Sequence, residues 1–246
     1  MMVRDRRLRW PIAANLEAAV RGQQVLGVER RAKYLIIRLE SGALIVHLGM
    51  SGSLRLIGGK MPAKPHEHWD LVLDSGQVLR FHDPRRFGSL HWTQDDPEQH
   101  PLLKKLAPEP LSAAFNGAYL FRVTRKRAVA IKQLIMNSQL VVGVGNIYAS
   151  EALFHAGISP RRAARRLTKA EAGKLSAAIK AVLRAAINIG GTTLRDYVND
   201  DGLPGYFRQK LFVYERAGER CRVCKSSVKQ FTQGQRSTYW CATCQR

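Results

Sequence analysis

The stretch CRVCKSSVKQFTQGQRSTYWCATC, residues 221–244, contains all four cysteines of the chain. They form two pairs, Cys221 with Cys224 and Cys241 with Cys244, and residues 225–240 separate the pairs. Two residues between the cysteines of each pair is the spacing with which two short turns bring four thiolates to one tetrahedral zinc ion. Because four thiolates leave no open coordination position, we predict one structural Zn²⁺ that organises a small module and takes no part in catalysis.

The loop between the two pairs is basic and partly aromatic. It carries Lys225, Lys229, Arg236, Tyr239 and Trp240. A hairpin of this composition is suited to phosphate and groove contacts. The alternative is an ordinary solvated surface, and composition alone leaves both open.

The whole chain shares this positive charge. Its 246 residues include 40 Lys and Arg against 19 Asp and Glu, a net charge of +21. An excess of this size favours a polyanionic partner, either nucleic acid or an anionic membrane surface. No apolar run approaches the roughly eighteen residues of a membrane span, and the first residues lack the apolar core of a secretory signal. With no cysteine outside the two pairs, we expect a reduced, cytoplasmic location.

Residues 24–92 consist of short β-rich runs separated by turns that contain glycine. Many short strands at such spacing are typical of a β-sandwich or a β-barrel. Residues 95–110 are polar and contain proline, which is typical of a linker. The expected strands are Val25–Arg30, Tyr34–Leu39, Ala43–Leu48, Leu54–Ile57, Leu71–Leu73, Val78–Phe81 and Ser89–Trp92.

The periodicity becomes helical after about residue 112. Thr168 and Glu171 form a capping box, and the apolar stripe behind it runs to Gly190 and Gly191, which predicts one long helix. The other expected elements are helices at Ala130–Met136 and Ile147–His155 and, in the zinc-bound hairpin, strands at Leu211–Tyr214 and Ser237–Trp240.

The segment Gly143-Val-Gly145-Asn146 opens one of these helices. Consecutive backbone N–H groups near a helix N-terminus form an anion site. An ordinary tight turn between two helices fits the same glycines. The phosphate-binding interpretation gains weight from the cations just upstream, which are Arg122, Arg125, Lys126, Arg127 and Lys132.

Two turns of the β-rich region carry residues suited to entering a duplex. Asp83-Pro-Arg-Arg-Phe87 places an arginine beside a phenylalanine, whose ring can wedge between base steps while the cation fills a gap in pairing. Met50, in a neighbouring turn, can act in the same way. From composition alone, core positions are the favoured assignment for Met50 and Phe87.

The sequence contains few of the usual catalytic arrangements. No Ser/His/Asp arrangement is recognisable, no histidine pair has catalytic metal spacing, and carboxylates are too sparse for a glycosidase pair or a two-metal nuclease. His66 and His68 lie near Lys64 in a polar stretch, where phosphate contact and solvation are both open. If the chain is an enzyme, an amine is the natural nucleophile.

Taken together, these segments resemble the formamidopyrimidine-DNA glycosylase family of bacterial base-excision repair enzymes. The resemblance runs from Arg7 to the C-terminus and includes the zinc quartet. Its other motifs are Arg7-Leu-Arg-Trp10, Arg30-Arg-Ala-Lys-Tyr-Leu35, His47-Leu-Gly-Met-Ser-Gly-Ser-Leu-Arg55, Asp83-Pro-Arg-Arg-Phe-Gly88, Leu140-Val-Val-Gly-Val-Gly-Asn-Ile-Tyr-Ala-Ser-Glu151 and Gly190-Gly-Thr-Thr193.

The resemblance implies an α+β fold with three parts. These are an N-terminal β-sandwich in residues 1–108, a helix-two-turn-helix DNA-binding domain in residues 109–208 and a four-cysteine zinc finger in residues 209–246. It implies a monomer, associated with the bacterial nucleoid, that binds damaged double-stranded DNA in the cleft between its lobes. In the family, a flipped 8-oxoguanine or formamidopyrimidine base is released while the N-terminal amine forms a Schiff base with the deoxyribose. β- and δ-elimination then cut the strand.

Site residues follow from the resemblance position by position. Lys33 matches the lysine that assists glycosidic cleavage and β-elimination, and Arg236 matches the zinc-finger arginine linked to phosphate binding and δ-elimination. Met50, Arg85 and Phe87 match the residues that fill the hole left by base flipping. Further DNA contacts are implied at His66, Arg85, Arg127 (a lysine in the family), Lys132 and Asn146.

The start of the chain departs from the family pattern. Family members begin, after loss of the initiator methionine, with Pro-Glu-Leu-Pro-Glu, whose proline is the nucleophile and whose first glutamate is the general acid. This sequence begins Met1-Met-Val-Arg-Asp5. We therefore expect a chain that is truncated relative to the family, with its Met1 amine displaced from the active site, part of the sandwich core uncovered and catalysis impaired.

Three functions remain open. The expected one is a glycosylase and AP lyase that removes oxidised purines. One alternative is a DNA-binding protein that recognises lesions without excising them. The other is an endonuclease VIII-type glycosylase for oxidised pyrimidines, which is disfavoured because Met50, Arg85 and Phe87 fit the purine-lesion pattern.

Overall fold

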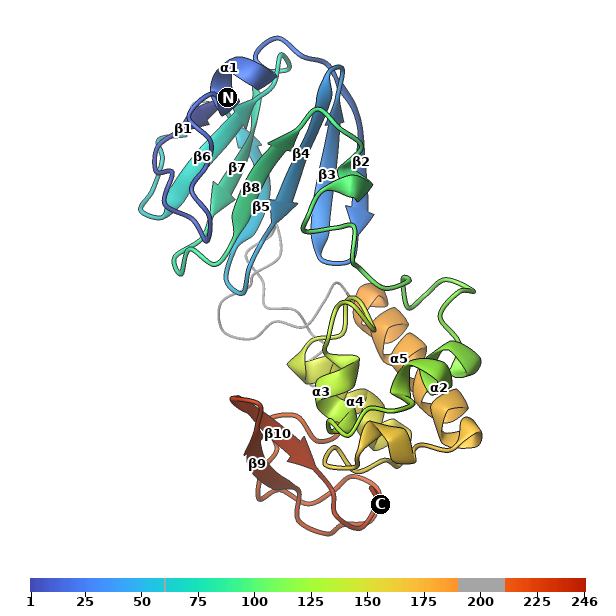
Figure 1. The fold of residues 1–246 in the computed structure, drawn as a ribbon. Helices are drawn as coiled ribbons and strands as arrows, with labels where there is room; N and C mark the ends of the chain where they lie inside the picture. Colours follow the sequence, from blue (N-terminus) through green and yellow to red (C-terminus); the bar gives the residue numbers. More distant parts are fainter. Residues whose placement is uncertain (60, 190–210) are drawn as a thin grey trace. The chain divides into compact units, whose positions relative to one another are not determined.

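The computed structural model describes residues 1–59, 61–189 and 211–246. Two compact units can be distinguished, residues 1–104 and residues 105–189 together with 211–246 (Figure 1). Among the described residues, no helix combines the length and the apolar character needed to cross a bilayer.

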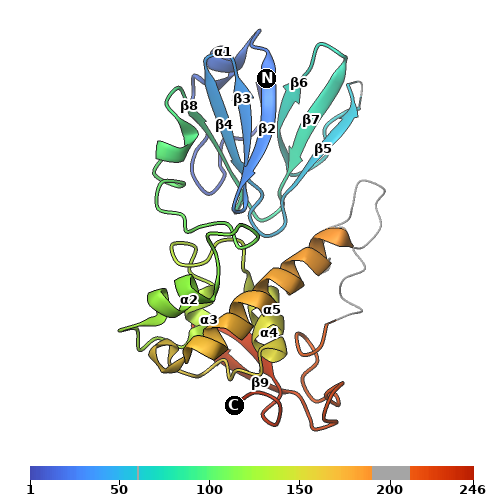
Figure 2. The same cartoon turned by 90° about the vertical axis from the view of Figure 1, so that its right-hand side faces the viewer.

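The first unit is a β-sandwich of two four-stranded antiparallel sheets, seen edge-on in Figure 2. One sheet has the order β1-β6-β7-β5 and the other β2-β3-β4-β8. The chain passes between the sheets three times, at β1–β2, β4–β5 and β7–β8. The elements are β1 Met2–Val3, α1 Leu16–Val20, β2 Val25–Arg31, β3 Tyr34–Leu39, β4 Gly42–His47, β5 Ser53–Gly58, β6 Glu67–Val72, β7 Gln77–His82, β8 Ser89–Thr93 and the 3₁₀ turn η1 Pro97–Gln99.

The core of the sandwich lies between the inner faces of the two sheets. Trp69 and Phe81 of one sheet stack at 5.3 Å between ring centroids, and Leu44, Val46 and Leu90 of the other sheet belong to the same buried cluster. Alternation along each strand sends these side chains inward. The predicted sandwich is therefore confirmed, and of the two architectures left open by the strand pattern the barrel is excluded.

β6 begins earlier than the sequence pattern predicts. The expected strand starts at Leu71, whereas the observed one starts at Glu67 and includes a polar stretch. Asp70 is buried there because its carboxylate accepts hydrogen bonds from the guanidinium groups of both Arg4 and Arg80, at 2.8–2.9 Å. A buried charge that is fully paired breaks the apolar alternation on which the prediction depended.

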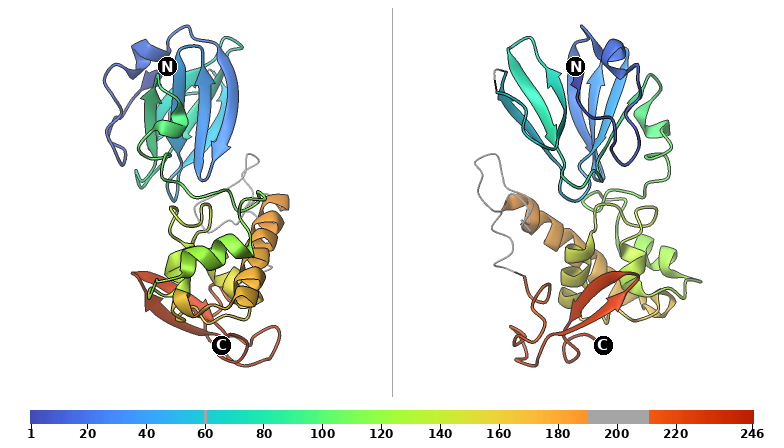
Figure 3. Two further views of the ribbon diagram at one scale, coloured as in Figure 1. Left: turned by 45° about the vertical axis from the view of Figure 1, so that its right-hand side comes forward. Right: turned by 90° about the vertical axis from the view of Figure 1, so that its left-hand side faces the viewer.

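The second unit combines a helical domain with a β-hairpin (Figure 3). α2 and α4 both pack against the long helix α5. The core between the helices includes Leu120, Leu153, Leu175 and Ile179. The elements are α2 Gly117–Thr124, α3 Ile131–Ile135, α4 Asn146–His155, the 3₁₀ turn η2 Ala164–Arg166, α5 Lys169–Asn188, β9 Lys229–Gln233 and β10 Arg236–Trp240.

The predicted capping box starts α5. The Thr168 hydroxyl accepts from the Glu171 N–H at 3.2 Å, and the Glu171 carboxylate accepts from the Thr168 N–H at 2.9 Å. The two shorter helices are confirmed to within one residue at each end. The motif Gly190-Gly-Thr-Thr193, including the expected helix end, lies outside the described residues.

The predicted strand Leu211–Tyr214 is wrong. The partner of β10 is β9, and the two are joined by a tight turn. Residues 211–214 form turns because the carboxylate of Glu151 accepts three consecutive backbone N–H groups, from Phe212, Val213 and Tyr214, at 2.8–3.0 Å. These N–H groups are thus satisfied by a buried side chain on α4, and no neighbouring strand is needed.

Candidate nucleic-acid interface and zinc centre

The four cysteines converge as their spacing predicts. Their Sγ atoms all lie within 4.8 Å of one another, with 3.3 Å between Cys224 and Cys241 and 3.9 Å between Cys221 and Cys244. Zn–S bonds of ~2.3 Å in a tetrahedron require S···S separations of about 3.8 Å, which these distances bracket. The residues therefore fit one closed, structural Zn²⁺, and the two cysteine-containing turns would hold it.

Backbone geometry explains how each pair folds around the site. Lys225 has a φ of +64°, and its N–H donates to the Cys221 carbonyl at 3.0 Å, which closes the first turn. In the second turn the buried Gln245 side chain accepts from the Cys241 N–H at 2.9 Å and donates to the Ile158 carbonyl at 3.0 Å. Gln245 thereby attaches the zinc module to the loop after α4.

The hairpin β9–β10 presents Arg236 at its tip. Gly234 and Gln235 both have positive φ, +55° and +59°, in the two-residue turn between Gln233 and Arg236. This pattern is typical of the type I′ turn, which matches the twist of the two strands. Arg236 therefore projects from the first residue of β10, and its side chain is exposed.

Two predicted DNA-contact residues meet the hairpin beside Arg236. Lys132 of α3 donates from Nζ to the Ser237 carbonyl at 3.1 Å and to the Thr238 hydroxyl at 2.7 Å. Asn146, the first residue of α4, donates from Nδ2 to the same Ser237 carbonyl at 2.9 Å. Lys132, Asn146 and Arg236 are therefore brought together, although Lys132 and Arg236 are 104 positions apart in the sequence.

A polar pocket of about 220 Å³ lies at this junction. Burial and, secondarily, the positive charge of Arg236 lower the pKa of Lys132 to about 8. Gln133 and Gln233 also line the pocket. The sequence did not indicate them, because they carry no charge and belong to no motif. The complete lining is Lys132, Gln133, Met136, Asn137, Gln233, Gly234 and Arg236.

Arg127 does not line this pocket. It follows α2, where its Nε donates to the Val123 carbonyl at 2.9 Å, and its side chain is exposed. Gly143, with a φ of +77°, precedes α4 in the turn that the sequence singled out. The role of Arg127 stays a prediction.

Strand register gathers the candidate residues of the first unit at one end of the sandwich. In one sheet, Arg31 pairs with Tyr34, Tyr34 with His47, and His47 with Ser89. Lys33, which is exposed, therefore lies in the β2–β3 turn at this end.

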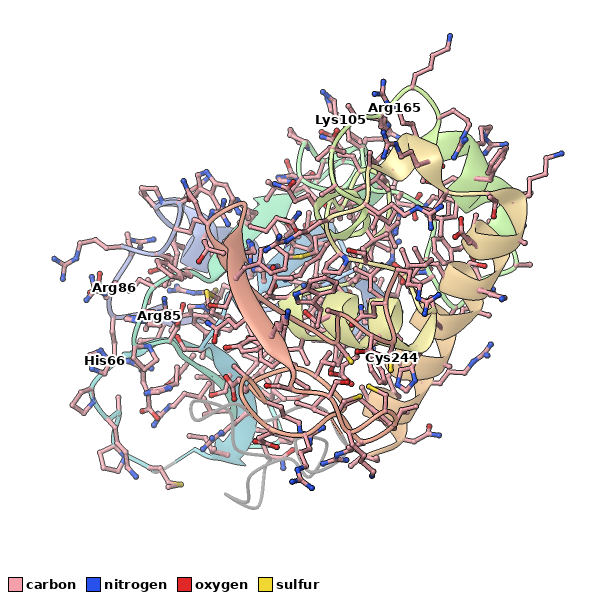
Figure 4. All side chains as sticks on the ribbon, turned by 90° about the horizontal axis from the view of Figure 1, so that it is seen from below. His66, Arg85, Arg86, Lys105, Arg165 and Cys244 are labelled. Carbon is pink, nitrogen blue, oxygen red and sulfur yellow. The ribbon has the colours of Figure 1, made fainter. Side chains whose placement is uncertain are left out.

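Two of the loops that cross between the sheets, β4–β5 and β7–β8, lie at the same end, which is the lower end of the sandwich in Figure 1. Residues 48–52 connect β4 to β5, and residues 83–88 connect β7 to β8. The second sheet extends to this end through Glu67, which pairs with His82. His66 precedes β6 there, and Figure 4 shows it near Arg85 and Arg86.

Met50 and Phe87 are exposed, so the core positions that composition alone favours are wrong. Met50 is 68% exposed and Phe87 is 43% exposed. The Arg85 guanidinium lies over the Phe87 ring, 4.8 Å from its centroid. An exposed methionine, phenylalanine and arginine at one end of a basic unit form the arrangement expected of a duplex wedge.

The two histidines of the polar stretch have different environments. His66 is exposed and has a φ of +70°. His68 is buried in β6, where its Nε2–H donates to the Asp83 carbonyl at 2.8 Å. His68 is thus neither solvated nor available to phosphate, and a contact at His66 stays a prediction.

His47 also lies at this end of the sandwich, and its side chain is neutral. The sequence motifs gave no role to it. Its burial, together with the nearby Lys33 and Arg9 charges, lowers the pKa of His47 to about 4. The unprotonated Nδ1 accepts the Gly49 N–H at 3.0 Å and so helps to hold the turn that carries Met50.

Met1 lies elsewhere in the first unit. Met2 pairs with Asp70 and Val3 with Trp69, so the chain runs along β6 toward the candidate end as residue number increases. At ~3.3 Å per strand residue, Met1 is displaced by roughly 13 Å along the sheet from Glu67. The Met1 amine therefore does not belong to the group formed by Lys33, Met50 and Arg85.

Three family profiles match the chain. The formamidopyrimidine-DNA glycosylase N-terminal domain matches residues 1–90, the formamidopyrimidine-DNA glycosylase H2TH domain matches residues 106–198, and the zinc finger found in FPG and IleRS matches residues 218–246.

Individual relatives agree with these matches. The formamidopyrimidine-DNA glycosylase of Stutzerimonas stutzeri is 56% identical over 246 residues, which are 100% of this chain and 91% of that protein. The Lactococcus lactis FPG (MutM) in complex with a FAPY-dG containing DNA is 28% identical, has a TM-score of 0.89 and aligns over 100% of this chain and 91% of its own. A MutM in complex with carbocyclic 8-oxo-G containing DNA is 31% identical, with a TM-score of 0.85 and coverage of 94% and 85%. With matching domains, matching fold and this level of identity, the chain belongs to the formamidopyrimidine-DNA glycosylase family.

Proposed function

We propose that this protein is a base-excision repair DNA glycosylase and AP lyase for oxidised purines, with 8-oxoguanine and formamidopyrimidine lesions in double-stranded DNA as its substrates. The observation that carries the proposal is the exposed group of Met50, Arg85 and Phe87 at one end of the sandwich. A glycosylase must extrude its target nucleotide, and such side chains fill the gap in the stack. Relatives of the same fold bind DNA that contains FAPY-dG or carbocyclic 8-oxo-G.

The domain organisation follows the same proposal. Residues 1–108 would supply the lesion-binding sandwich, residues 109–208 the helix-two-turn-helix domain and residues 209–246 the zinc finger. The protein would act as a monomer on the DNA of the nucleoid. The net charge of +21 supports this assignment because phosphate neutralisation dominates the affinity for DNA.

Each candidate residue has a proposed role. Lys132, Asn146 and Arg236 bind phosphates beside the lesion, and Arg236 also assists δ-elimination. Lys33 assists glycosidic cleavage and β-elimination from the β2–β3 turn. The remaining contacts to the DNA backbone are assigned to His66 and Arg127, both of which are exposed.

Catalysis also needs a nucleophilic amine, which the family takes from an N-terminal proline. Residues 1–246 contain no Pro-Glu-Leu-Pro-Glu segment. A polypeptide that consists of these residues is therefore proposed to bind oxidised-purine DNA but to cut it poorly.

Competition binding distinguishes oxidised purines from oxidised pyrimidines as ligands. We expect a duplex with 8-oxoguanine to be bound at least ~10-fold more tightly than a matched duplex with dihydrouracil, a difference of about 1.4 kcal/mol. The assay is fluorescence anisotropy with a labelled 8-oxoguanine duplex and either unlabelled competitor. A preference for dihydrouracil would favour the endonuclease VIII-type alternative and contradict the proposal.

DNA affinity is expected to depend on pH through Lys132. With a pKa of about 8, below the ordinary lysine value, Lys132 is charged at pH 7 and loses its charge as the pH rises through 8. Two of its three protons are donated to Ser237 and Thr238, which leaves one for a phosphate. Between pH 7 and pH 9, we expect affinity for duplex DNA to fall roughly three- to tenfold.

The Lys132→Met variant tests this assignment. It should bind more weakly at pH 7 and lose the fall between pH 7 and pH 9, whereas Lys174→Met, at an exposed lysine of α5, should keep the pH dependence of the unchanged protein. If the DNA affinity of Lys132→Met fell as much between pH 7 and pH 9 as that of the unchanged protein, another titrating group would be responsible.

A further inference from the structure

Asp83 is a fully buried carboxylate in the loop that carries Arg85 and Phe87, with a relative exposure of 0%. Its Oδ1 accepts the Ser51 hydroxyl at 2.8 Å, and its Oδ2 accepts the Gly88 N–H at 2.7 Å. Ser51 belongs to the loop that carries Met50. One side chain therefore joins the two loops of the proposed wedge, and buried charge-assisted hydrogen bonds of this kind are strong.

The two loops also touch through their backbones. Gly49 has a φ of +70°, and a Cβ at this position would lie 2.6 Å from the Phe87 carbonyl carbon and 2.7 Å from the Gly88 nitrogen. Only glycine permits so close an approach. The residue before Met50 is thus packed directly against the backbone of Phe87.

The backbone of Asp83 joins a third segment to this pair. Its N–H donates to the His66 carbonyl at 3.0 Å, and its carbonyl accepts from the buried His68 ring at 2.8 Å and from the Arg86 N–H at 3.3 Å. Every described polar group of Asp83 is therefore engaged in holding loops, and neither carboxylate oxygen points to solvent.

We propose that Asp83 is a positioning residue that holds Met50, Arg85 and Phe87 as one preformed wedge for insertion into the duplex. The inference rests on the proposed function, and it adds a residue that does not itself reach DNA. Met50 and Phe87 are exposed while Asp83, Ser51 and Gly88 behind them are buried. A wedge that is already ordered does not lose conformational freedom when it enters the stack, so more of its contact energy is available for unstacking the bases.

Wedge insertion can be followed separately from binding with 2-aminopurine placed beside an 8-oxoguanine, because this base fluoresces more strongly when it is unstacked. At saturating protein the amplitude of the increase reports insertion and is insensitive to the fraction bound. We expect Asp83→Ala to reduce this amplitude at least fivefold, while its affinity for an undamaged duplex, which depends on phosphate contacts, stays within threefold.

Two further variants separate positioning from general stability. In Asp83→Asn the amide oxygen can accept the Gly88 N–H while the amide N–H donates to the Ser51 hydroxyl, so at least half of the amplitude should be retained. Asp70→Asn removes another buried carboxylate of the same sandwich, one bonded to Arg4 and Arg80. It should lower the melting temperature yet retain the full amplitude.

The outcomes are distinguishable. Full amplitude in folded Asp83→Ala, or an amplitude equally reduced in Asp70→Asn, would overturn the inference and leave the proposed function intact. Absence of any increase with the unchanged protein would overturn both. If Asp83→Ala does not fold, the Ser51→Ala variant replaces it, because it removes one of the two hydrogen bonds to the Asp83 carboxylate. We expect Ser51→Ala to reduce the fluorescence amplitude at least twofold. An unchanged amplitude would overturn the inference.

Discussion

Loss of zinc is expected to abolish tight DNA binding. The hairpin that presents Arg236 depends on four thiolates within 4.8 Å of one another, and a bound structural zinc contributes its free energy directly to folding. Without the ion, Arg236 is no longer fixed beside Lys132 and Asn146, and the three proposed phosphate contacts are lost together. We expect affinity to fall on the order of 100-fold, about 2.8 kcal/mol.

The Cys241→Ser variant and chelation of the unchanged protein provide the measurement. Anisotropy titration with duplex DNA should show the weakened binding in both, and added Zn²⁺ should restore only the chelated protein. Thr243→Ala is the matched control, since Thr243 lies between the second pair of ligands and its hydroxyl donates to the Ser226 hydroxyl at 3.0 Å. Unchanged affinity in Cys241→Ser would mean that the zinc module does not contribute to the interface.

Covalent trapping by a polypeptide of residues 1–246 is expected to be weak. A terminal amine titrates near ~8 and an ordinary lysine near ~10.4, so at pH 7 the neutral, nucleophilic fraction of a lysine is lower by roughly two orders of magnitude. The Met1 amine is held with β1 beside the middle of β6, away from Lys33. Among the described residues at the candidate end, Lys33 offers a substitute amine, and its reaction should be slow.

Borohydride reduction during incubation with DNA measures this reaction. Little adduct should form with an 8-oxoguanine duplex, and slow adduct formation with an abasic duplex should disappear in Lys33→Ala if Lys33 is the substitute nucleophile. Arg31→Ala, at a nearby cation in the same β2–β3 region, serves as the control for lost charge. Efficient trapping on the 8-oxoguanine duplex would contradict the expected impairment.

Features that depend on local spacing could be predicted from the sequence. The zinc quartet needs only two short turns, and the capping box of α5 needs only Thr168 and Glu171, so both appear in the structure as expected. Most strands were also predictable, because their inward faces alternate. The part of β6 from Glu67 to Asp70 was not predicted. Its buried Asp70 carboxylate is neutralised by Arg4, which is far away in the sequence.

Features that depend on long-range contacts could not be predicted in this way. The turn at residues 211–214 is set by Glu151, and no local pattern indicates that one carboxylate will accept three N–H groups there. Met50 and Phe87 are exposed on two loops that meet at Gly49 and at the buried Asp83. Their apolar residue type alone favours core positions instead. The resemblance to a family implied DNA-facing positions for Met50 and Phe87, and both residues are exposed.

Recognition of an oxidised purine is measured by the affinity ratio between an 8-oxoguanine duplex and the identical undamaged duplex. Both titrations should be made with residues 1–246 at one fixed ionic strength, because phosphate contacts contribute to both duplexes. We expect at least ~10-fold tighter binding to the damaged duplex, a difference of about 1.4 kcal/mol. Equal affinity for the two duplexes would contradict it.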